Sequence, residues 1–459
     1  MMKTVSPLVD LERGRIHAGV FFDPEIYRQE IERVFGRCWL LLCHESEIGE
    51  VGDYVTTYMG EDPVIVCRDS RGKVRAYLNF CRHRGSMVCR AERGRTKSFT
   101  CGYHMWTYSI DGELVGVPFE DKAYPEGLDR RELALIEVPR VASYKGFIFG
   151  CWDERAEALE RYLGDFRWYF DILVERALGG WEVVPGVQKC VIECNWKLHS
   201  ENFAGDMYHV LLTHGFARRP GLDPFAYFGD KLSAYIELPA YVTTFPEGHS
   251  MIDILHHGEY YHLDREVAKT LGPEGEEYVE ACYRRLREVL SPKQADVYGL
   301  GPGLIFPNTA FLDFGCLFPL GIYTFHPKGP EKHEYWARHL VDRAAPAAVK
   351  EMLRKNFIWG QSVGGMFTPD DTDGFSRLQE AIRGTVGRKQ WLDYHMGLAR
   401  EGQVPEEERD YPGDVGPRPS ERGQRNFYRR WRELLNRSHP EEEGHGGEGR
   451  PAGGRTVPL

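Results

Sequence analysis

Two short cysteine–histidine pairs constrain this chain more than any other feature of its sequence. One residue separates Cys81 from His83, and 17 residues separate His83 from Cys101. Two residues then separate Cys101 from His104. Each pair follows a short apolar run that is typical of a β-strand, so each is expected at the tip of a loop. The fold therefore has to bring together two loops that carry two thiols and two imidazoles.

This set of side chains favours an iron–sulfur centre. Two thiolates on one iron and two imidazoles on the other form a Rieske [2Fe–2S] cluster. A tetrahedral zinc site is the alternative, but zinc fingers usually pair cysteine with cysteine and histidine with histidine, whereas each half here is mixed. Gly85 and Gly102 let the backbone approach a cluster closely. The predicted cluster ligands are Cys81, His83, Cys101 and His104.

A further cysteine, Cys89, lies between the two pairs and is predicted to be a small buried residue rather than a ligand. No second cysteine stands in the later loop to form a bridge with it, because Gly102 occupies that place. We therefore expect packing to hold the two loops, with Trp106 and Tyr108 as the candidate packing residues.

The predicted secondary structure changes along the chain. Residues 24–36 have an apolar stripe at helical spacing, and short strand-like runs with close turns follow it. Beyond them, helical stretches mix with strands without regular βαβ alternation, which is typical of an α+β fold. The predicted parts are 1–39, belonging to the larger domain; 40–155, a small β-sandwich Rieske domain; 156–437, a larger α+β catalytic domain with helices on an antiparallel sheet; and 438–459, a disordered polar tail.

A second constellation of polar residues lies in a segment that is predicted to be helical. Asn202, Asp206 and His209 fall at i, i+4 and i+7, which places them on one face of a helix. His214 comes five residues after His209, about 140° around an ideal helix. Both imidazoles bind one ion only if the helix ends or distorts there, and Gly215 would be a suitable terminator.

Two imidazoles leave a mononuclear metal site one protein ligand short. The segment 364–375 supplies several aspartates after a Gly-Gly turn, and two histidines with one carboxylate leave a face of Fe(II) open for oxygen and substrate. Alone, the histidine spacing is a weak signal and the aspartates are typical of a solvated cap. The cluster strengthens the interpretation, because an electron carrier needs an acceptor. Competing ligands or acid–base groups are His199, which is expected to be structural, Glu201 and Tyr208.

The order of these motifs resembles that of a known family. C-x-H-x₁₇-C-x₂-H, then N-W-K-x₄-N-x₃-D-x-Y-H-x₄-H, then Asp-Asp is similar to the large (α) subunits of Rieske non-haem iron aromatic-ring-hydroxylating dioxygenases, in the naphthalene and biphenyl branch. The resemblance covers nearly the whole chain except the acidic Gly-rich tail. It implies that the four Cys and His residues bind the cluster and that His209, His214 and Asp371 bind Fe(II).

The resemblance also implies a path for the electrons. Asp206 matches a bridging carboxylate that links His104 of one subunit to His209 of the next, so Asp206 and Asn202 are the predicted catalytic residues beside the iron. One departure concerns the residues before the aspartate pair. Thr368-Pro369 precedes this pair where many relatives carry an acidic residue, so the choice between Asp370 and Asp371 stays open.

The implied reaction is insertion of both atoms of O₂ into an aromatic ring to give a cis-dihydrodiol. No G-x-G-x-x-G follows a strand, so NADH is oxidised elsewhere; the resemblance implies a ferredoxin and its NADH-dependent reductase, with a β subunit in an α₃β₃ assembly. Apolar candidates for the substrate pocket favour a hydrocarbon, in particular a polycyclic one. These candidates are Phe203, Met207, Val210, Phe325 and Phe367.

Other functions have to be weighed against this one. A dioxygenase for a carboxylated aromatic and a Rieske monooxygenase, such as a demethylase, would use the same two metal sites. A Rieske electron-transfer protein would belong to a different class, but it would leave the 300 or so residues beyond the β-domain without a task.

Composition excludes further classes. Asp and Glu number 69 against 58 Lys and Arg, a net charge of −11 that gives no general attraction to nucleic acid or anionic lipid. No uninterrupted run of 18 apolar residues and no apolar leader is present. Eleven cysteines, sparse and odd in number, do not suit a disulfide scaffold. We therefore expect a cytoplasmic protein that binds neither nucleic acid nor membranes.

Overall fold

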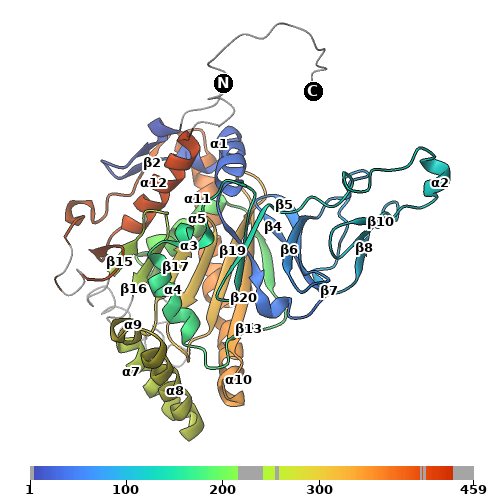
Figure 1. Cartoon of the computed structure of the whole chain (residues 1–459). Coiled ribbons are helices and arrows are strands. Elements are labelled where there is room, and N and C mark those ends of the chain that lie inside the picture. Colours follow the sequence, from blue (N-terminus) through green and yellow to red (C-terminus); the bar gives the residue numbers. More distant parts are fainter. Residues whose placement is uncertain (1–4, 215–240, 254–257, 404–405, 407–409, 438–459) are drawn as a thin grey trace.

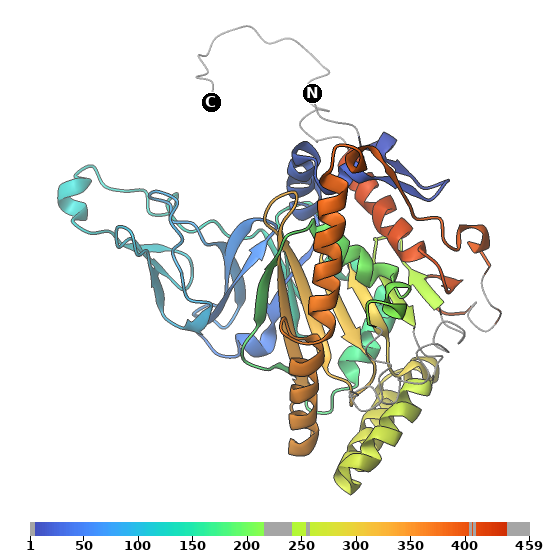
Figure 2. The same ribbon diagram turned by 180° about the vertical axis from the view of Figure 1, so that it is seen from behind.

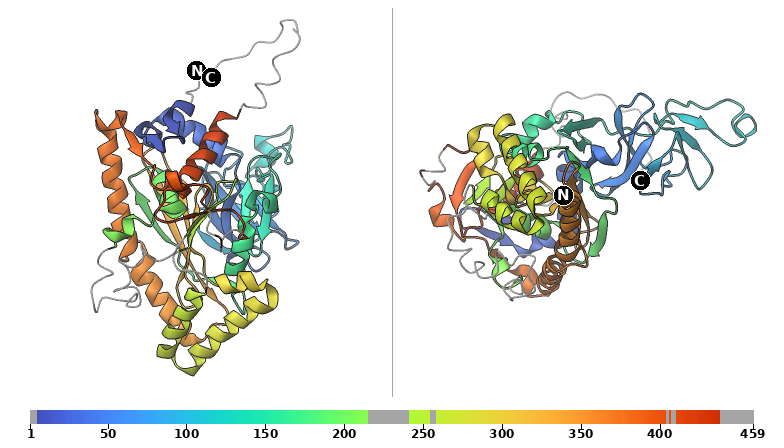
Figure 3. Two further views of the ribbon diagram at one scale, coloured as in Figure 1. Left: turned by 90° about the vertical axis from the view of Figure 1, so that its left-hand side faces the viewer. Right: turned by 90° about the horizontal axis from the view of Figure 1, so that it is seen from below.

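The structure is a computed structural model that describes residues 5–214, 241–253, 258–403, 406 and 410–437. The predicted tail, 438–459, lies outside the described residues, as does Gly215. In the described part, small antiparallel sheets form a β-domain that projects from one side of a larger sheet-and-helix domain (Figure 3). This architecture confirms the predicted α+β class.

The N-terminal helix forms as its apolar spacing predicts. Asp23 caps α1 (Pro24–Glu30), because its carboxylate accepts hydrogen bonds from the backbone N–H groups of the first turn. A π-helical turn, η3 (Ile31–Phe35), continues it. Val34 and Phe35 are buried, so this segment packs its apolar face into the core of the larger domain.

Ten short strands build the described β-domain as three sheets. The sheet orders are β6-β5-β4-β7, β10-β9-β8 and β11-β12-β3, and all the pairings within them are antiparallel. A short helix, α2 (Glu120–Ala123), lies at the far tip (Figure 1). The strands are β3 (Leu40–His44), β4 (Asp53–Met59), β5 (Asp62–Arg68), β6 (Val74–Leu78), β7 (Arg93–Arg95), β8 (Ser98–Thr100), β9 (Thr107–Ser109), β10 (Leu114–Gly116), β11 (Arg140–Tyr144) and β12 (Phe147–Cys151).

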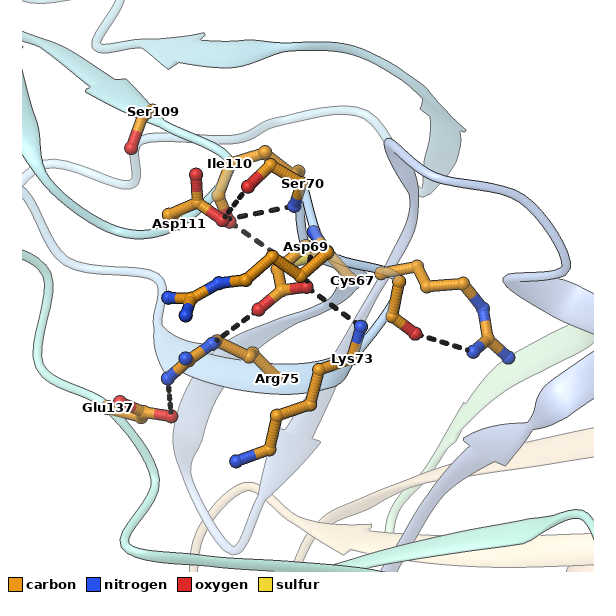
Figure 4. A network of polar contacts seen from close by, with 12 residues as sticks. Cys67, Asp69, Ser70, Lys73, Arg75, Ser109, Ile110, Asp111 and Glu137 are labelled. Atoms are coloured by element: carbon orange, nitrogen blue, oxygen red, sulfur yellow. Dashed lines mark hydrogen bonds and ion pairs between the residues drawn. The ribbon is translucent and has the colours of Figure 1, made fainter.

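A polar network joins two of these sheets (Figure 4). In the turn between β5 and β6, the buried Asp69 carboxylate accepts two backbone N–H bonds of the hairpin and pairs with Arg75 at 2.8 Å. Arg75 also reaches Glu137 at 2.7 Å. Ser70 donates from its N–H and its hydroxyl to Asp111, in the turn between β9 and β10. Side chains therefore fix the hairpin on the sheet that carries one of the cysteine–histidine loops.

The larger domain is built on an antiparallel sheet that has nine strands in the described residues. The order is β13-β20-β19-β18-β17-β16-β15-β22, and β14 also pairs with β20. A small separate sheet has the order β1-β2-β21. The strands are β13 (Trp181–Val183), β14 (Gln188–Ile192), β15 (Tyr241–Thr244), β16 (Ser250–Asp253), β17 (Gly301–Ile305), β18 (Thr309–Asp313), β19 (Leu320–Pro327), β20 (His333–Asp342), β22 (Asp414–Pro417), β1 (Val9–Asp10), β2 (Arg15–His17) and β21 (Trp391–Asp393).

Helices cover both faces of the large sheet. Helices α3 (Leu159–Leu163) and α4 (Phe166–Glu175) lie in front of it in Figure 1, whereas α10 (Ala347–Asn356) and α11 (Phe367–Arg383) lie in front when it is seen from behind in Figure 2. A helical pair projects from one end. The remaining helices are α5 (Trp196–Gly205), α7 (Glu259–Ala268), α8 (Pro273–Val289), α9 (Pro292–Val297) and α12 (Arg422–Asn436).

Helix α5 is held at its start by a buried ion pair. The Nζ atom of Lys197 lies 2.6 Å from the Glu30 carboxylate on α1, and neither side chain is exposed. The indole N–H groups of Trp196 and Trp431 donate to the same carboxylate at 2.9 Å. One acid from the N-terminal helix thus holds α5 and α12 together.

The other end of α5 touches α12 through bare backbone. A Cβ atom added at Gly423 would lie 1.9 Å from the carbonyl oxygen of Ala204, and one added at Gly205 would lie 3.0 Å from Gly423 Cα. Two glycines are therefore needed for this close approach. The contact fixes the end of α5, where Asp206 follows.

Candidate metal centres

The two cysteine–histidine loops have the same backbone hydrogen bonds. The N–H of Cys81 donates to the carbonyl of the residue five positions later, and its own carbonyl accepts from the N–H of Gly85. Cys101 repeats both bonds, with Met105 in the position of Gly85. Gly85 and Met105 both have positive φ, 74° and 60°. Each loop thus turns its cysteine and histidine toward the same side.

The side chains of the two loops meet within the β-domain. The rings of His83 and His104 are 4.5 Å apart, and Trp106 stacks on His83 at 4.8 Å and 8° between the planes. The Tyr108 hydroxyl lies 3.5 Å from Cys81 Sγ and accepts the N–H of Arg82 at 3.0 Å. The structure thus confirms packing by Trp106 and Tyr108, and it shows Cys89 buried, as predicted.

These four residues fit the predicted cluster chemically. The Nδ1 atom of His83 is buried without a hydrogen-bond partner among the described residues, as a metal-binding nitrogen would be. Burial on its own would raise the pKa of Cys101, but the N–H groups of Tyr103 and His104 and the thiol of Cys81 outweigh it and lower that pKa. The site therefore favours a thiolate, which is the form that binds metal.

Two imidazoles and one carboxylate meet in the larger domain. One carboxylate oxygen of Asp371 lies 3.4 Å from Nε2 of His209 and 3.3 Å from Nε2 of His214. The three ligand atoms lie within 4.8 Å of one another. Burial would raise the pKa of Asp371, but the two histidines lower it well below the usual range. This donor set fits a 2-His-1-carboxylate iron site.

The Asp371 carboxylate comes from the start of a helix that follows the predicted Gly-Gly turn. The segment around the Asp pair forms the start of α11, with Pro369 in its first turn, where a missing N–H breaks no helical bond. The predicted Gly-Gly turn is present before this helix, and the solvated-cap alternative does not hold for Asp371, which contacts both histidines. Asp371 reaches both histidines, whereas Asp370 is not part of that group.

The predicted helical face is also corrected, because α5 ends at Gly205. Asp206 has extended backbone, with φ −93° and ψ 95°, and its carboxylate accepts the N–H groups of Tyr208 and His209. Aspartate competes with helical hydrogen bonding in this way. A short 3₁₀ turn, η5 (His209–Leu211), follows. The helix thus ends before His209, whereas the predicted terminator, Gly215, lies outside the described residues.

The two predicted catalytic residues contact the far side of the His209 ring. Nδ1 of His209 lies 3.3 Å from the Asp206 carboxylate and 3.4 Å from the Asn202 side-chain amide. Its Nε2 atom faces Asp371. A carboxylate at Nδ1 keeps the proton there and leaves Nε2 as the metal-binding atom. The Asp206 side chain is 33% exposed, so a neighbouring molecule can reach it.

The pocket candidates do not all lie together. Phe203 and Phe325 are 5.9 Å apart, and the ring of Phe367 contacts His214 at 4.9 Å. Val210 is half-buried beside His209. Met207 instead lines a small hollow that is formed with Tyr208, Met396 and Ser420.

Two tyrosines near the site were not singled out from the sequence. The hydroxyl groups of Tyr394 and Tyr428 donate to the Glu201 carboxylate, the first at 2.8 Å. Burial raises the pKa of Glu201 to about 8, although both tyrosines lower it. A buried acid on a helix needs donors, but the sequence does not reveal which distant hydroxyls supply them.

Comparisons with known proteins show the family to which the chain belongs. Residues 38–144 match the model of the Rieske [2Fe-2S] domain, and residues 159–437 match that of the ring hydroxylating alpha subunit catalytic domain. The chain belongs to the ring-hydroxylating dioxygenase α subunits. Biphenyl 2,3-dioxygenase subunit alpha of Rhodococcus jostii is 38% identical over 441 residues, 94% of this chain and 91% of that protein.

Further relatives of this α subunit support the same assignment. Benzene 1,2-dioxygenase subunit alpha of Pseudomonas putida is 34% identical, over 94% of this chain and 93% of that one. A naphthalene 1,2-dioxygenase structure with indole in its active site superimposes with a TM-score of 0.84 at 32% identity, covering 97% and 96% of the two chains. The protein is thus an oxidoreductase that uses a Rieske cluster and mononuclear non-haem iron, not a simple electron carrier. No helix within the described ranges is long and apolar enough to cross a membrane.

Proposed function

We propose that this α subunit binds its mononuclear iron through His209, His214 and Asp371 and its cluster through the two cysteine–histidine loops. The observation that carries the first part is the single Asp371 oxygen that lies within 3.4 Å of both Nε2 atoms. When bound, the cluster supplies electrons and the iron supplies the site at which O₂ is activated. The loop residues proposed as cluster ligands are Cys81, His83, Cys101 and His104.

The surrounding residues have distinct tasks in this proposal. Asp206 holds the proton of His209 at Nδ1, and Asn202 orients the same ring. Phe203 and Phe325 form an aromatic wall that excludes water from the reacting side. An aromatic hydrocarbon has no group that forms a hydrogen bond. The shape of the pocket therefore has to position the substrate.

The proposed substrate is an uncharged aromatic hydrocarbon, with two or more rings, that is converted to a cis-dihydrodiol. Relatives are named as biphenyl and naphthalene dioxygenases, and one solved naphthalene dioxygenase binds phenanthrene. Three aromatic pocket candidates, Phe203, Phe325 and Phe367, support an apolar ring. A carboxylated substrate would require a cationic side chain at the pocket instead.

The proposed assembly is an α₃β₃ hexamer that receives electrons from NADH through a reductase and a ferredoxin. Within the described part of this chain, no hydrogen bond or ion pair joins His104 to Asp206. Tyr103 and Met105, beside His104, are 59% and 66% exposed. An exposed apolar tip next to the cluster ligands suits contact with a neighbouring subunit, so transfer would run from His104 of one subunit to Asp206 of the next.

The test uses the complete oxygenase with reductase, ferredoxin and NADH. Mono-, bi- and polycyclic aromatics and a carboxylated aromatic are supplied under ¹⁸O₂, and the products are identified by mass spectrometry. A cis-diol with two labelled oxygens from a polycyclic hydrocarbon is expected. Singly labelled or demethylated products would indicate a monooxygenase, and turnover of only the carboxylated compound would contradict the proposed substrate.

Matched variants test the ligands. His209→Ala and Asp371→Ala should lose mononuclear iron and turnover while the visible spectrum of the cluster is retained. Asp370→Ala is the control, because Asp370 lies beside Asp371 but outside the group with the two histidines, and it should keep its iron. Iron retained in Asp371→Ala but lost in Asp370→Ala would reverse the assignment.

A further inference from the structure

A second group of metal-binding side chains lies in the core of the larger domain, apart from the two iron sites. Cys194 follows β14, His199 is on α5, and His333 begins β20. Their exposed fractions are 0%, 2% and 0%. One possible ligand atom from each lies within 4.8 Å of those from the other two. The fold thus brings a thiol and two imidazoles together from three separate elements.

The hydrogen bonds of His333 leave its second nitrogen available. Its Nδ1 atom lies 2.9 Å from the carbonyl oxygen of Cys194 and 3.9 Å from the sulfur of the same residue. A carbonyl only accepts, so Nδ1 carries the proton and Nε2 keeps its lone pair. Orientation of one histidine nitrogen by a carbonyl is common among metal ligands.

Two nitrogen atoms in this group are buried without partners. Neither Nε2 of His333 nor Nδ1 of His199 has a hydrogen-bond partner in the described part of the chain. Leaving a buried polar atom unpaired is unfavourable, because the atom loses its hydrogen bonds to water without replacement. The two rings are 4.8 Å apart, and His199 also contacts the rings of Phe325, Tyr335 and Phe375. A bound ion is an occupant that would satisfy both nitrogens.

The chemistry of the donors selects the type of ion. Soft thiolate ligands prefer Cu⁺ and Zn²⁺, whereas Mg²⁺ and Ca²⁺ need oxygen ligands. Full burial disfavours net charge. Cu⁺ with one thiolate is neutral, but Zn²⁺ with one thiolate keeps a positive charge. Three donors suit Cu⁺, which accepts three-coordinate geometry.

From this geometry we propose that Cys194, His199 and His333 form a buried binding site for a thiophilic d¹⁰ ion, with Cu⁺ bound more tightly than Zn²⁺. Binding breaks the S–H bond of Cys194, forms a metal–sulfur bond and releases one proton, with no change of oxidation state. The site links α5 to β20, so a bound ion cross-links the helix that carries Asn202 to the central sheet.

An entry route lies close to the site. Glu193 and Lys332 directly precede Cys194 and His333, and they form an exposed ion pair at 3.5 Å. Local opening of this pair would expose the sulfur without unfolding the sheet. Salt should therefore speed the uptake of the ion.

The experiment uses the intact oxygenase under anaerobic conditions. The protein is incubated with one equivalent of Cu⁺, or separately of Zn²⁺, and then dialysed against a chelator for that ion, with the cluster spectrum monitored throughout. The wild type should retain one copper ion per α chain. Cys194→Ser and His333→Gln should each lose it, whereas Cys190→Ser, a control on β14 four residues earlier, should retain it.

X-ray absorption at the copper edge provides a readout that needs no variant. One sulfur and two nitrogen neighbours are expected in the wild-type protein. Equal copper in the wild type and Cys194→Ser, or a copper environment without sulfur, would overturn the proposal. Retention of Zn²⁺ but not Cu⁺ would overturn the order of affinity.

Discussion

The Asp206 side chain has a structural contact and, in the proposed function, a second task in electron transfer. Its carboxylate caps the turn that contains His209 by accepting two backbone N–H bonds, and it also lies 3.3 Å from Nδ1 of the same histidine. Asparagine keeps an oxygen for the backbone bonds but removes the charge. The two tasks can therefore be separated by one substitution.

We predict that Asp206→Asn keeps both metals but lowers turnover about 10- to 100-fold, because the neutral amide no longer holds the His209 proton as the carboxylate does. The measurement is iron content, the cluster spectrum and the rate at which the reduced cluster is reoxidised in the presence of substrate and O₂. Reoxidation of the cluster at the wild-type rate would contradict a bridging role for Asp206.

Glu201 gives a prediction about pH. Its pKa is raised to about 8 by burial, so between pH 4.5 and 8 the folded protein holds a proton that the unfolded chain releases. Stability should fall as pH rises through this window and level off above it. Glu201→Gln removes the titratable carboxyl group, so stability should depend less on pH in this variant. Thermal unfolding from pH 5 to 9 measures the difference, and parallel curves would contradict it.

At the scale of single elements, α5 depends on an acid from a distant helix. Glu30 binds Lys197 and accepts hydrogen bonds from both indoles in a site closed to solvent. Removing one partner of a buried ion pair leaves the other charge uncompensated, which is more costly than replacing both.

Glu30→Gln should therefore destabilise the protein by about 3–5 kcal/mol. The double variant Glu30→Gln with Lys197→Met should recover part of this loss, because no buried charge remains. Urea unfolding of the wild type, both single variants and the double variant measures the coupling. If the losses in free energy of unfolding of the two single variants add up to that of the double variant, the interaction between Glu30 and Lys197 contributes nothing to stability.

Local spacing predicted the cluster loops well, because Cys81-x-His83 and Cys101-x₂-His104 each form within one turn. It also predicted that Asp206 meets His209. The helix break was not predicted, because the acceptance of backbone N–H groups by Asp206 competes closely with continued helix. Helix α11 was not predicted either. Proline usually breaks a helix, and only the structure shows that Pro369 lies in the first turn, where proline is tolerated.

At the scale of the whole molecule, the two metal sites belong to different parts of the chain, and the exposed tip at Tyr103 and Met105 faces outward. If electrons cross between subunits, a subunit with only a cluster and a subunit with only iron should complement each other.

We predict that co-expressed Cys101→Ser and His209→Ala chains assemble into mixed oxygenase with partial activity, although each variant alone is inactive. Product formation per total iron, after separation of the mixed assembly by two affinity tags, is the measurement. A mixed assembly without any activity would indicate that transfer stays within one chain. Wild type combined with each single variant gives the control for assembly.

The backbone contact of Gly205 with Gly423 ties the carboxyl-terminal helix to the start of the iron-binding segment. A methyl group at either position forces the two helices apart, and the next residue to move is Asp206. Substitutions at Gly205 and Gly423, which lie far apart in the sequence, are therefore expected to affect each other. If Asp206 carries electrons as proposed, removal of α12 would slow electron entry to the iron and not merely shorten the chain.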